Sequence, residues 1–126
     1  MAAEAIVVRP KISADAFEAG VSEKVDRLIA VYGASGLAAL LGASRSQPTR
    51  WRAGHERPAR PTVQRLLALD FLTSRLAEVF TARQTEVWLD SPNPYLGGAA
   101  PARVFIQFGG SAVEPAISAV EVGAVV

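Results

Sequence analysis

Apolar side chains in this chain recur at helical spacing, in segments that end at glycine or proline. The first such set falls at i, i+4, i+7, i+8 and i+11 and consists of Val21, Val25, Leu28, Ile29 and Tyr32. This spacing places the set on one face of a helix that Gly33 is in position to close. No segment shows the strict alternation of a half-buried strand. The fold class is therefore predicted to be all-α.

The same pattern predicts the other helices. They cover residues 35–41, 45–53, 62–80, 82–90, 101–108 and 111–122. Ser35 and Thr62 are suitable N-caps for two of them, and Gly42 and Gly54 are suitable C-terminal residues. The stripe of the longest helix consists of Leu66, Leu69, Leu72, Leu76, Val79 and Phe80. Residues 1–20 show no such period and are expected to form a partly disordered arm.

Composition excludes several classes of protein. The absence of cysteine rules out disulfides, thiolate catalysis and Cys-ligated zinc, and it favours a reducing cytoplasm. The opening MAAEAIVVRPK lacks the charge order and cleavage pattern of a signal peptide. The uncharged run between Arg27 and Arg45 is interrupted by glycine and serine and is too short for a membrane span. A soluble, cytoplasmic protein is expected.

No group of residues has the spacing of a catalytic site. The one histidine, His55, lies in a proline-rich loop, where it could contact a phosphate or have no role. The chain has no nucleophile elbow, no carboxylate pair at a catalytic spacing and no phosphate-binding glycine loop. The chain is predicted not to be an enzyme and to use no cofactor or metal ion.

Positive charge is concentrated in one part of the chain. Residues 45–65 hold six arginines and one acid, Glu56, whereas residues 66–126 hold three bases and six acids. A basic island of this kind fits a polyanion such as DNA. A solvated helix face would explain the same charges.

Residues 37–54, LAALLGASRSQPTRWRAG, have the layout of a helix-turn-helix. A short apolar helix ends at a glycine, a three-residue turn follows, and a second helix begins at a capping serine. The first turn of that second helix would enter the major groove. The residues predicted to contact bases or phosphates are Arg45, Ser46, Gln47, Thr49, Arg50 and Arg52. Trp51 is predicted to anchor the helix to the core.

This unit resembles the helix-turn-helix of Xre-type repressors over about residues 24–60. The serine-opened second helix and the ending Arg50-Trp51-Arg52-x-Gly54 carry the resemblance. Pro48 departs from it, because many of these repressors have a β-branched apolar residue there. Since proline is tolerated only in a first helical turn, the helix is expected to start late, with Ser46 as its cap. A hairpin whose arginines only face water remains the alternative.

The segment WLDSPNPYLGG, residues 88–98, interrupts the helical pattern. The string Pro92-Asn93-Pro94 is held out of helical space, and Gly97-Gly98 permit a tight turn. We expect a stiff surface loop that displays Tyr95 and Leu96. Such a loop loses little entropy on docking and suits recognition, although a loop that only redirects the chain would use the same residues.

Together with Pro101 and the long preceding helix, this loop resembles the C-terminal toxin-binding domain of the MbcA/ParS/Xre antitoxin family. With the Xre-like part, the resemblance covers nearly everything after residue 20. It implies an arm over 1–20, a helix-turn-helix part over 21–61 and a small helical toxin-binding domain over 62–126. It also implies a type II antitoxin that inhibits a RES-domain, NAD-degrading toxin and represses its own operon.

The resemblance implies the residues that contact the toxin. They are Trp88, Asn93, Pro94, Tyr95, Leu96, Gly97 and Gly98, and, at the apolar C-terminus, Glu121, Val122, Gly123, Ala124, Val125 and Val126. This tail is expected either to occlude the NAD pocket of the toxin or to pack on its own domain. The implied partners are the toxin, operator DNA and a second copy of the chain in a larger assembly. A regulator whose C-terminal half only dimerises is the alternative.

Overall fold

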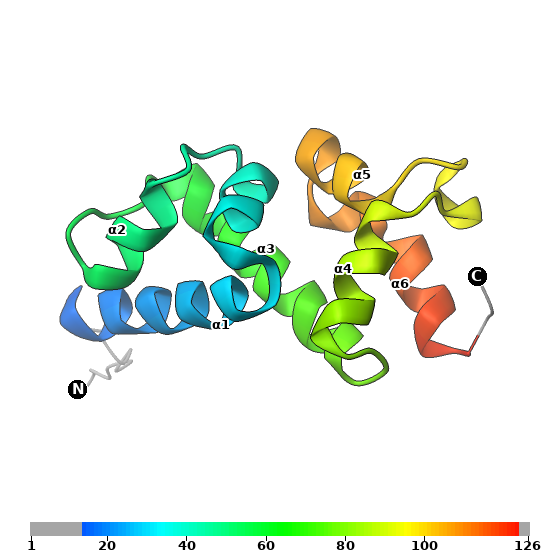
Figure 1. Cartoon of the computed structure of the whole chain (residues 1–126), viewed down its shortest axis with the longest axis horizontal. Coiled ribbons are helices and arrows are strands. Elements are labelled where there is room, and N and C mark those ends of the chain that lie inside the picture. The colour runs from blue at the N-terminus through cyan, green and yellow to red at the C-terminus, as the bar shows by residue number, and fades with distance from the viewer. Residues whose placement is uncertain (1–13, 124–126) are drawn as a thin grey trace, which may run out of the picture.

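The computed structural model describes residues 14–123, which form helices joined by short loops (Figure 1). The elements are α1 (Ala14–Leu41), α2 (Gln47–Ala53), α3 (Arg60–Ala77), α4 (Ala82–Asp90), the 3₁₀ turn η1 (Pro94–Leu96), α5 (Pro101–Phe108), the 3₁₀ turn η2 (Gly110–Val113) and α6 (Glu114–Glu121). The described range contains no strand, and the all-α prediction is confirmed. None of its helices combines the length and the apolar character that a membrane span requires.

The predicted arm over residues 1–20 is wrong in its last part, because α1 already begins at Ala14. The segment before Val21 is rich in alanine, the residue with the highest helix propensity. Its single interior glycine, Gly20, costs about 1 kcal/mol and does not end the helix. Residues 1–13 lie outside the described residues.

Gly33 divides α1 into two parts, as its position in the sequence predicts. Its backbone angles, φ 76° and ψ 163°, are not helical and are open in practice only to glycine. In Figure 1 the chain changes direction here, between the blue and the cyan parts of α1. The second part ends at Gly42, where the N–H of Ala43 donates to the carbonyl oxygen of Ala38 at 2.8 Å.

The long helix α3 begins earlier and ends earlier than predicted. Its N-cap is Ala59, not Thr62, because Pro61 fits the first turn, where a missing N–H costs nothing. It ends at Ala77, so the last two residues of the predicted stripe, Val79 and Phe80, lie beyond it. The other four stripe residues, Leu66, Leu69, Leu72 and Leu76, are buried as predicted.

α3 connects the two ends of the molecule. It contacts α1 and also α6, and in Figure 1 it runs behind the molecule from α1 and α2 toward α4 and α6. One hydrophobic cluster includes side chains of both ends, from Val25 on α1 to Ile117 on α6. The division of the chain at residue 61 remains a prediction.

Candidate functional site

The second helix of the predicted helix-turn-helix starts late. α2 begins at Gln47, with Pro48 buried in its first turn and Ser46 at the N-cap position. The helix predicted over residues 45–53 therefore begins two residues later, as Pro48 led us to expect, because proline is tolerated only in the first turn of a helix. The hydroxyl of Ser46 makes no cap bond and instead accepts a hydrogen bond from Nη1 of Arg50 at 2.6 Å.

Trp51 anchors α2, as predicted, since only 4% of it is exposed. Its indole Nε1 donates to Oε2 of Glu56 at 3.3 Å. The same carboxylate accepts from Nε2 of Gln47 at 2.9 Å and from Nε of Arg50 at 2.8 Å. These hydrogen bonds, that from Arg50 first, hold the pKa of Glu56 below its usual value. Two of the predicted DNA contacts, Gln47 and Arg50, are thus bound to an acid of the same chain.

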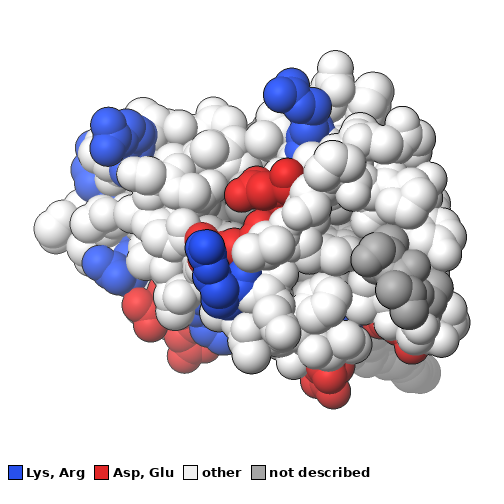
Figure 2. Space-filling view, turned by 45° about the vertical axis from the view of Figure 1, so that its right-hand side comes forward, with Lys and Arg blue, Asp and Glu red and all other residues white. Residues whose placement is uncertain are grey.

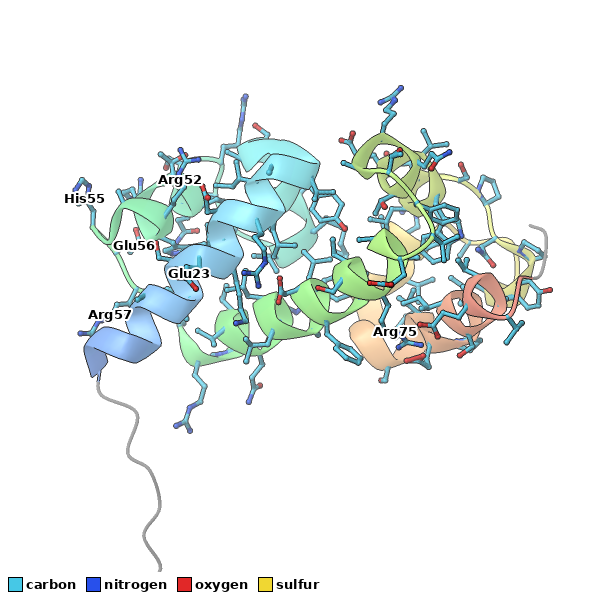
Figure 3. All side chains as sticks on the ribbon, turned by 90° about the horizontal axis from the view of Figure 1, so that it is seen from below. Glu23, Arg52, His55, Glu56, Arg57 and Arg75 are labelled. Atoms are coloured by element: carbon cyan, nitrogen blue, oxygen red, sulfur yellow. The ribbon has the colours of Figure 1, made fainter. Side chains whose placement is uncertain are left out.

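The remaining predicted DNA contacts lie at the same end of the molecule. Arg45 and Thr49 are exposed. Arg52 lies 3.6 Å from Asp26 on α1, and its carbonyl oxygen accepts from the hydroxyl of Ser22. Figure 3 shows Arg52, His55, Glu56 and Arg57 together around α2 and the start of α1. This end can attract a polyanion, and Glu56 offsets part of its charge.

The 93–98 loop is rigid because it satisfies its own polar groups. Asn93 is buried, and its Oδ1 accepts from the N–H of Tyr95 at 2.9 Å. The carbonyl oxygen of Asn93 accepts hydrogen bonds from the N–H groups of Leu96 and Gly98. The backbone N–H of Asn93 donates to the carbonyl oxygen of Ala99. Gly97 has φ 68°, in the left-handed region that glycine enters cheaply.

Of the two side chains that the loop was predicted to display, one is exposed. Tyr95 is 45% exposed, whereas Leu96 is partly buried against the core. Trp88 is buried and packs on Phe80, with ring centroids 6.4 Å apart. Trp88 and Asn93, both implied by the resemblance as contacts for the toxin, are therefore buried, and Asn93 holds the loop in shape from within the fold.

The exposed apolar side chains of this half are Val79, Val87, Tyr95, Ile106, Phe108 and Val122. The sequence predicted Val79 in the stripe of the long helix and Tyr95 and Val122 as contacts for the toxin, whereas it indicated no role for the other three. Figure 2 shows that the right-hand part of its face is almost free of charge. Apolar residues that fall outside a helical stripe are the only sequence signal for such a surface, and that signal is weak because many exposed apolar residues have no role.

The C-terminal helix is fastened to α3. Arg75 bonds Glu121 through Nε at 2.9 Å and Nη2 at 2.6 Å, and it bonds Glu114 through Nη1 at 2.7 Å. The pKa values of both carboxyl groups are lowered, chiefly by these bonds. Glu121, predicted to be a contact for the toxin, thus has a partner in its own chain. Val122 is 80% exposed, and Ala124, Val125 and Val126 lie outside the described residues.

A cleft of about 190 Å³ lies between α4, α5 and the stretch of α1 on both sides of Gly33. Its lining includes Tyr32, Leu40 and Ile106, with Glu86 and Asp90 from α4. In Figure 2, acidic side chains gather at the centre of the molecular surface that faces the viewer. Among residues 14–123 no group of three or more His, Asp or Glu side chains could hold a metal ion.

No protein-family model matches the chain. The chain is 38% identical over 82 residues to the mycobacterial cidal antitoxin MbcA of Mycobacterium tuberculosis (strain H37Rv), an alignment that covers 65% of this chain and 71% of the relative. The MbcA of Mycobacterium bovis matches with the same identity and coverage. The fold is also similar to one chain in the crystal structure of the M. tuberculosis MbcT-MbcA toxin-antitoxin complex. The two chains are 32% identical and superpose with a TM-score of 0.67, and the match covers 87% of this chain and 97% of that chain.

Proposed function

Because this chain belongs to the family of the mycobacterial antitoxin MbcA, we propose that it is the antitoxin of a toxin-antitoxin system. The observation that carries the proposal is the match in sequence and fold, which spans 97% of a chain from a toxin-antitoxin complex. The function is binding and inhibition of a cognate toxin, with no catalysis by this chain.

We assign the toxin contacts to the apolar half of the molecule. The 93–98 loop presents Tyr95 on a rigid backbone, and a rigid contact loses little entropy on binding. Buried Asn93 holds this loop in shape through its hydrogen bonds to the loop backbone. The exposed Val87 and Ile106 add apolar area on α4 and α5.

We further propose an identity for the toxin and a role for the C-terminal residues of this chain. The toxin is a RES-domain enzyme that degrades NAD, and residues 122–126 occlude its NAD pocket. Exposed Val122 supports this role, since apolar surface in water costs roughly 0.8 kcal/mol for each methylene-sized group. With the loop bound nearby, the tail acts at a high effective concentration.

Co-expression with a RES-domain toxin, taken from the reading frame beside this one where that frame encodes such a protein, tests the proposal. The wild-type chain should restore growth and keep cellular NAD at its normal level. A chain that ends at Val122 keeps Glu121 and its bonds to Arg75, so it should fold and bind the toxin body while NAD loss returns. Full protection by the truncated chain would place inhibition in the body of the domain. No protection by the full chain would contradict the antitoxin function.

A second role at the basic end is repression of the chain's own operon. The support is the helix-turn-helix order of α1 and α2, with Arg45 exposed just before α2 and Thr49 exposed in its first turn. A two-fold operator calls for a homodimer, for which exposed Leu67 and Phe71 on α3 offer an apolar surface. A regulator whose C-terminal half only dimerises is the alternative, and the co-expression experiment separates it from an antitoxin.

A further inference from the structure

Arg75 lies between the two ends of α6. Its guanidinium contacts Glu114, the first residue of the helix, at 2.6 Å and Glu121, the last residue, at 2.6 Å. The bond to Glu121 is bidentate, through Nε and Nη2. The guanidinium also lies over the ring of Phe71, 5.4 Å from its centroid. Figure 3 shows Arg75 where α3 and α6 lie together.

This arrangement is more than one exposed ion pair. An isolated surface pair contributes about 0–1 kcal/mol because two long side chains must be immobilised for one contact. Here one side chain, only 20% exposed, serves two carboxylates and is itself held against a ring. Arginine suits this role because its planar group donates several hydrogen bonds in a fixed geometry.

α6 needs such a fastening. It has eight residues, and a helix of that length has little stability of its own in water. Ile117 and Val120 hold its inner face in the core, while Arg75 holds its outer face at both ends. Only Val122 and Gly123 of the described chain follow Glu121. Val122 directly follows Glu121, so its backbone lies next to the last contact with Arg75.

We propose that Arg75 is a positioning residue that fixes the end of α6, and with it the positions of Val122 and Gly123, for inhibition of the toxin. The proposal rests on the proposed antitoxin function. It assigns Glu121 to Arg75 of its own chain and not to an arginine of the toxin. The contact with the toxin then begins at Val122, whose position Arg75 fixes through Glu121.

Two variants that break the clamp in different ways test the proposal. Arg75→Met removes the cation and keeps an apolar stem, and Glu121→Gln removes one charge and leaves the contact with Phe71 intact. The control is Arg27→Met, which breaks the ion pair of Arg27 with Asp70, at 3.1 Å between α1 and α3, far from α6 in sequence. Arg75→Lys is the conservative variant, because it keeps the positive charge beside both carboxylates and loses only the planar fork of the guanidinium.

Amide hydrogen exchange gives a readout that does not need the toxin. The N–H of Val122 donates to Ser118 at 3.1 Å, and the N–H of Gly123 donates to Val120 at 3.0 Å. Protection of these two amides should fall about tenfold or more in Arg75→Met and in Glu121→Gln, and stay unchanged in Arg27→Met. Amide protection in α2 should not change in any of the three variants. Unchanged protection at both amides would overturn the clamp.

Inhibition of the RES-domain partner is measured in parallel. The concentration of chain needed for half-inhibition should rise about tenfold in Arg75→Met and much less in Arg75→Lys, since a misdirected tail has a lower effective concentration. Lost amide protection with unchanged inhibition would overturn the positioning role while the antitoxin function stands. If the wild-type chain does not inhibit, the antitoxin function and the role of Arg75 in it both fail, and the exchange data still decide whether Arg75 fixes α6.

Discussion

Tyr32 joins the two longest helices of the protein through one hydrogen bond. Its buried hydroxyl lies 2.6 Å from Oγ1 of Thr73, so α1 and α3 share a polar contact inside the core. Burial raises the pKa of Tyr32 to about 12, against the smaller opposing effect of the bond to Thr73. The folded state therefore favours the neutral phenol more strongly than the unfolded chain does.

At the scale of this residue we predict a loss of stability in alkali. Because the pKa in the folded state is raised, the contribution of Tyr32 is complete below pH 10 and is lost as the pH rises toward 12. A shift of about two units corresponds to roughly 2–3 kcal/mol in the free energy of unfolding. Urea unfolding between pH 8 and pH 12 measures it, in a Tyr95→Phe background where Tyr32 is the one remaining tyrosine.

Tyr32→Phe is the matched control. At pH 8 it should lower the free energy of unfolding by about 1–2 kcal/mol, because Thr73 loses its buried partner. Above pH 10 its stability should decline less than that of the parent. Equal declines in the two proteins would show that Tyr32 is not the group that titrates.

At the scale of the element, Gly33 and Gly36 occupy one helix with opposite requirements. Gly33 adopts a φ of 76° at the kink, whereas Gly36 is helical, and a methyl group added to it would lie 3.4 Å from Cβ of Tyr32, an ordinary contact. Gly33→Ala should destabilise the protein by about 1–3 kcal/mol. Gly36→Ala should be neutral or stabilise it by up to about 1 kcal/mol. Urea unfolding compares them, and equal effects would contradict the assigned kink.

At the scale of the whole molecule, charge and apolar surface lie at different ends. The α2 end carries Arg45, Arg50 and Arg52, whereas the end with α4 to α6 exposes apolar side chains. The proposed roles are separable because each uses its own end. Variants at one end should leave the other role intact.

Binding to the chain's own promoter tests the basic end. The Arg50→Ala/Arg52→Ala double variant should bind more weakly, with a salt dependence flatter by about one unit per lost phosphate contact. Glu56→Gln should bind more tightly, since it removes the acid that Gln47 and Arg50 contact. Arg83→Ala, at an exposed position of α4, is the control. No mobility shift by the wild-type chain at low salt, with or without toxin, would contradict the DNA-binding role.

The helices of this protein could be predicted from its sequence because their signals are local. The apolar period of α1, the proline that opens α5 and the glycine that divides α1 act on their own neighbours in the chain. The 93–98 loop could be predicted for the same reason, since proline and glycine restrict or free the backbone where they stand. The resemblance to the antitoxin family likewise depends mainly on a short run of residues, the segment 88–98.

The partners of the charged and polar side chains were decided by the tertiary structure. Arg75 and Glu121 are 46 residues apart, and Tyr32 and Thr73 are 41 residues apart. Glu56 and Glu121 look like free charges in the sequence, yet packing places each beside an arginine of the same chain. Helical period determines which face of a helix is buried, but only the packing of helices against one another brings distant side chains within hydrogen-bonding distance.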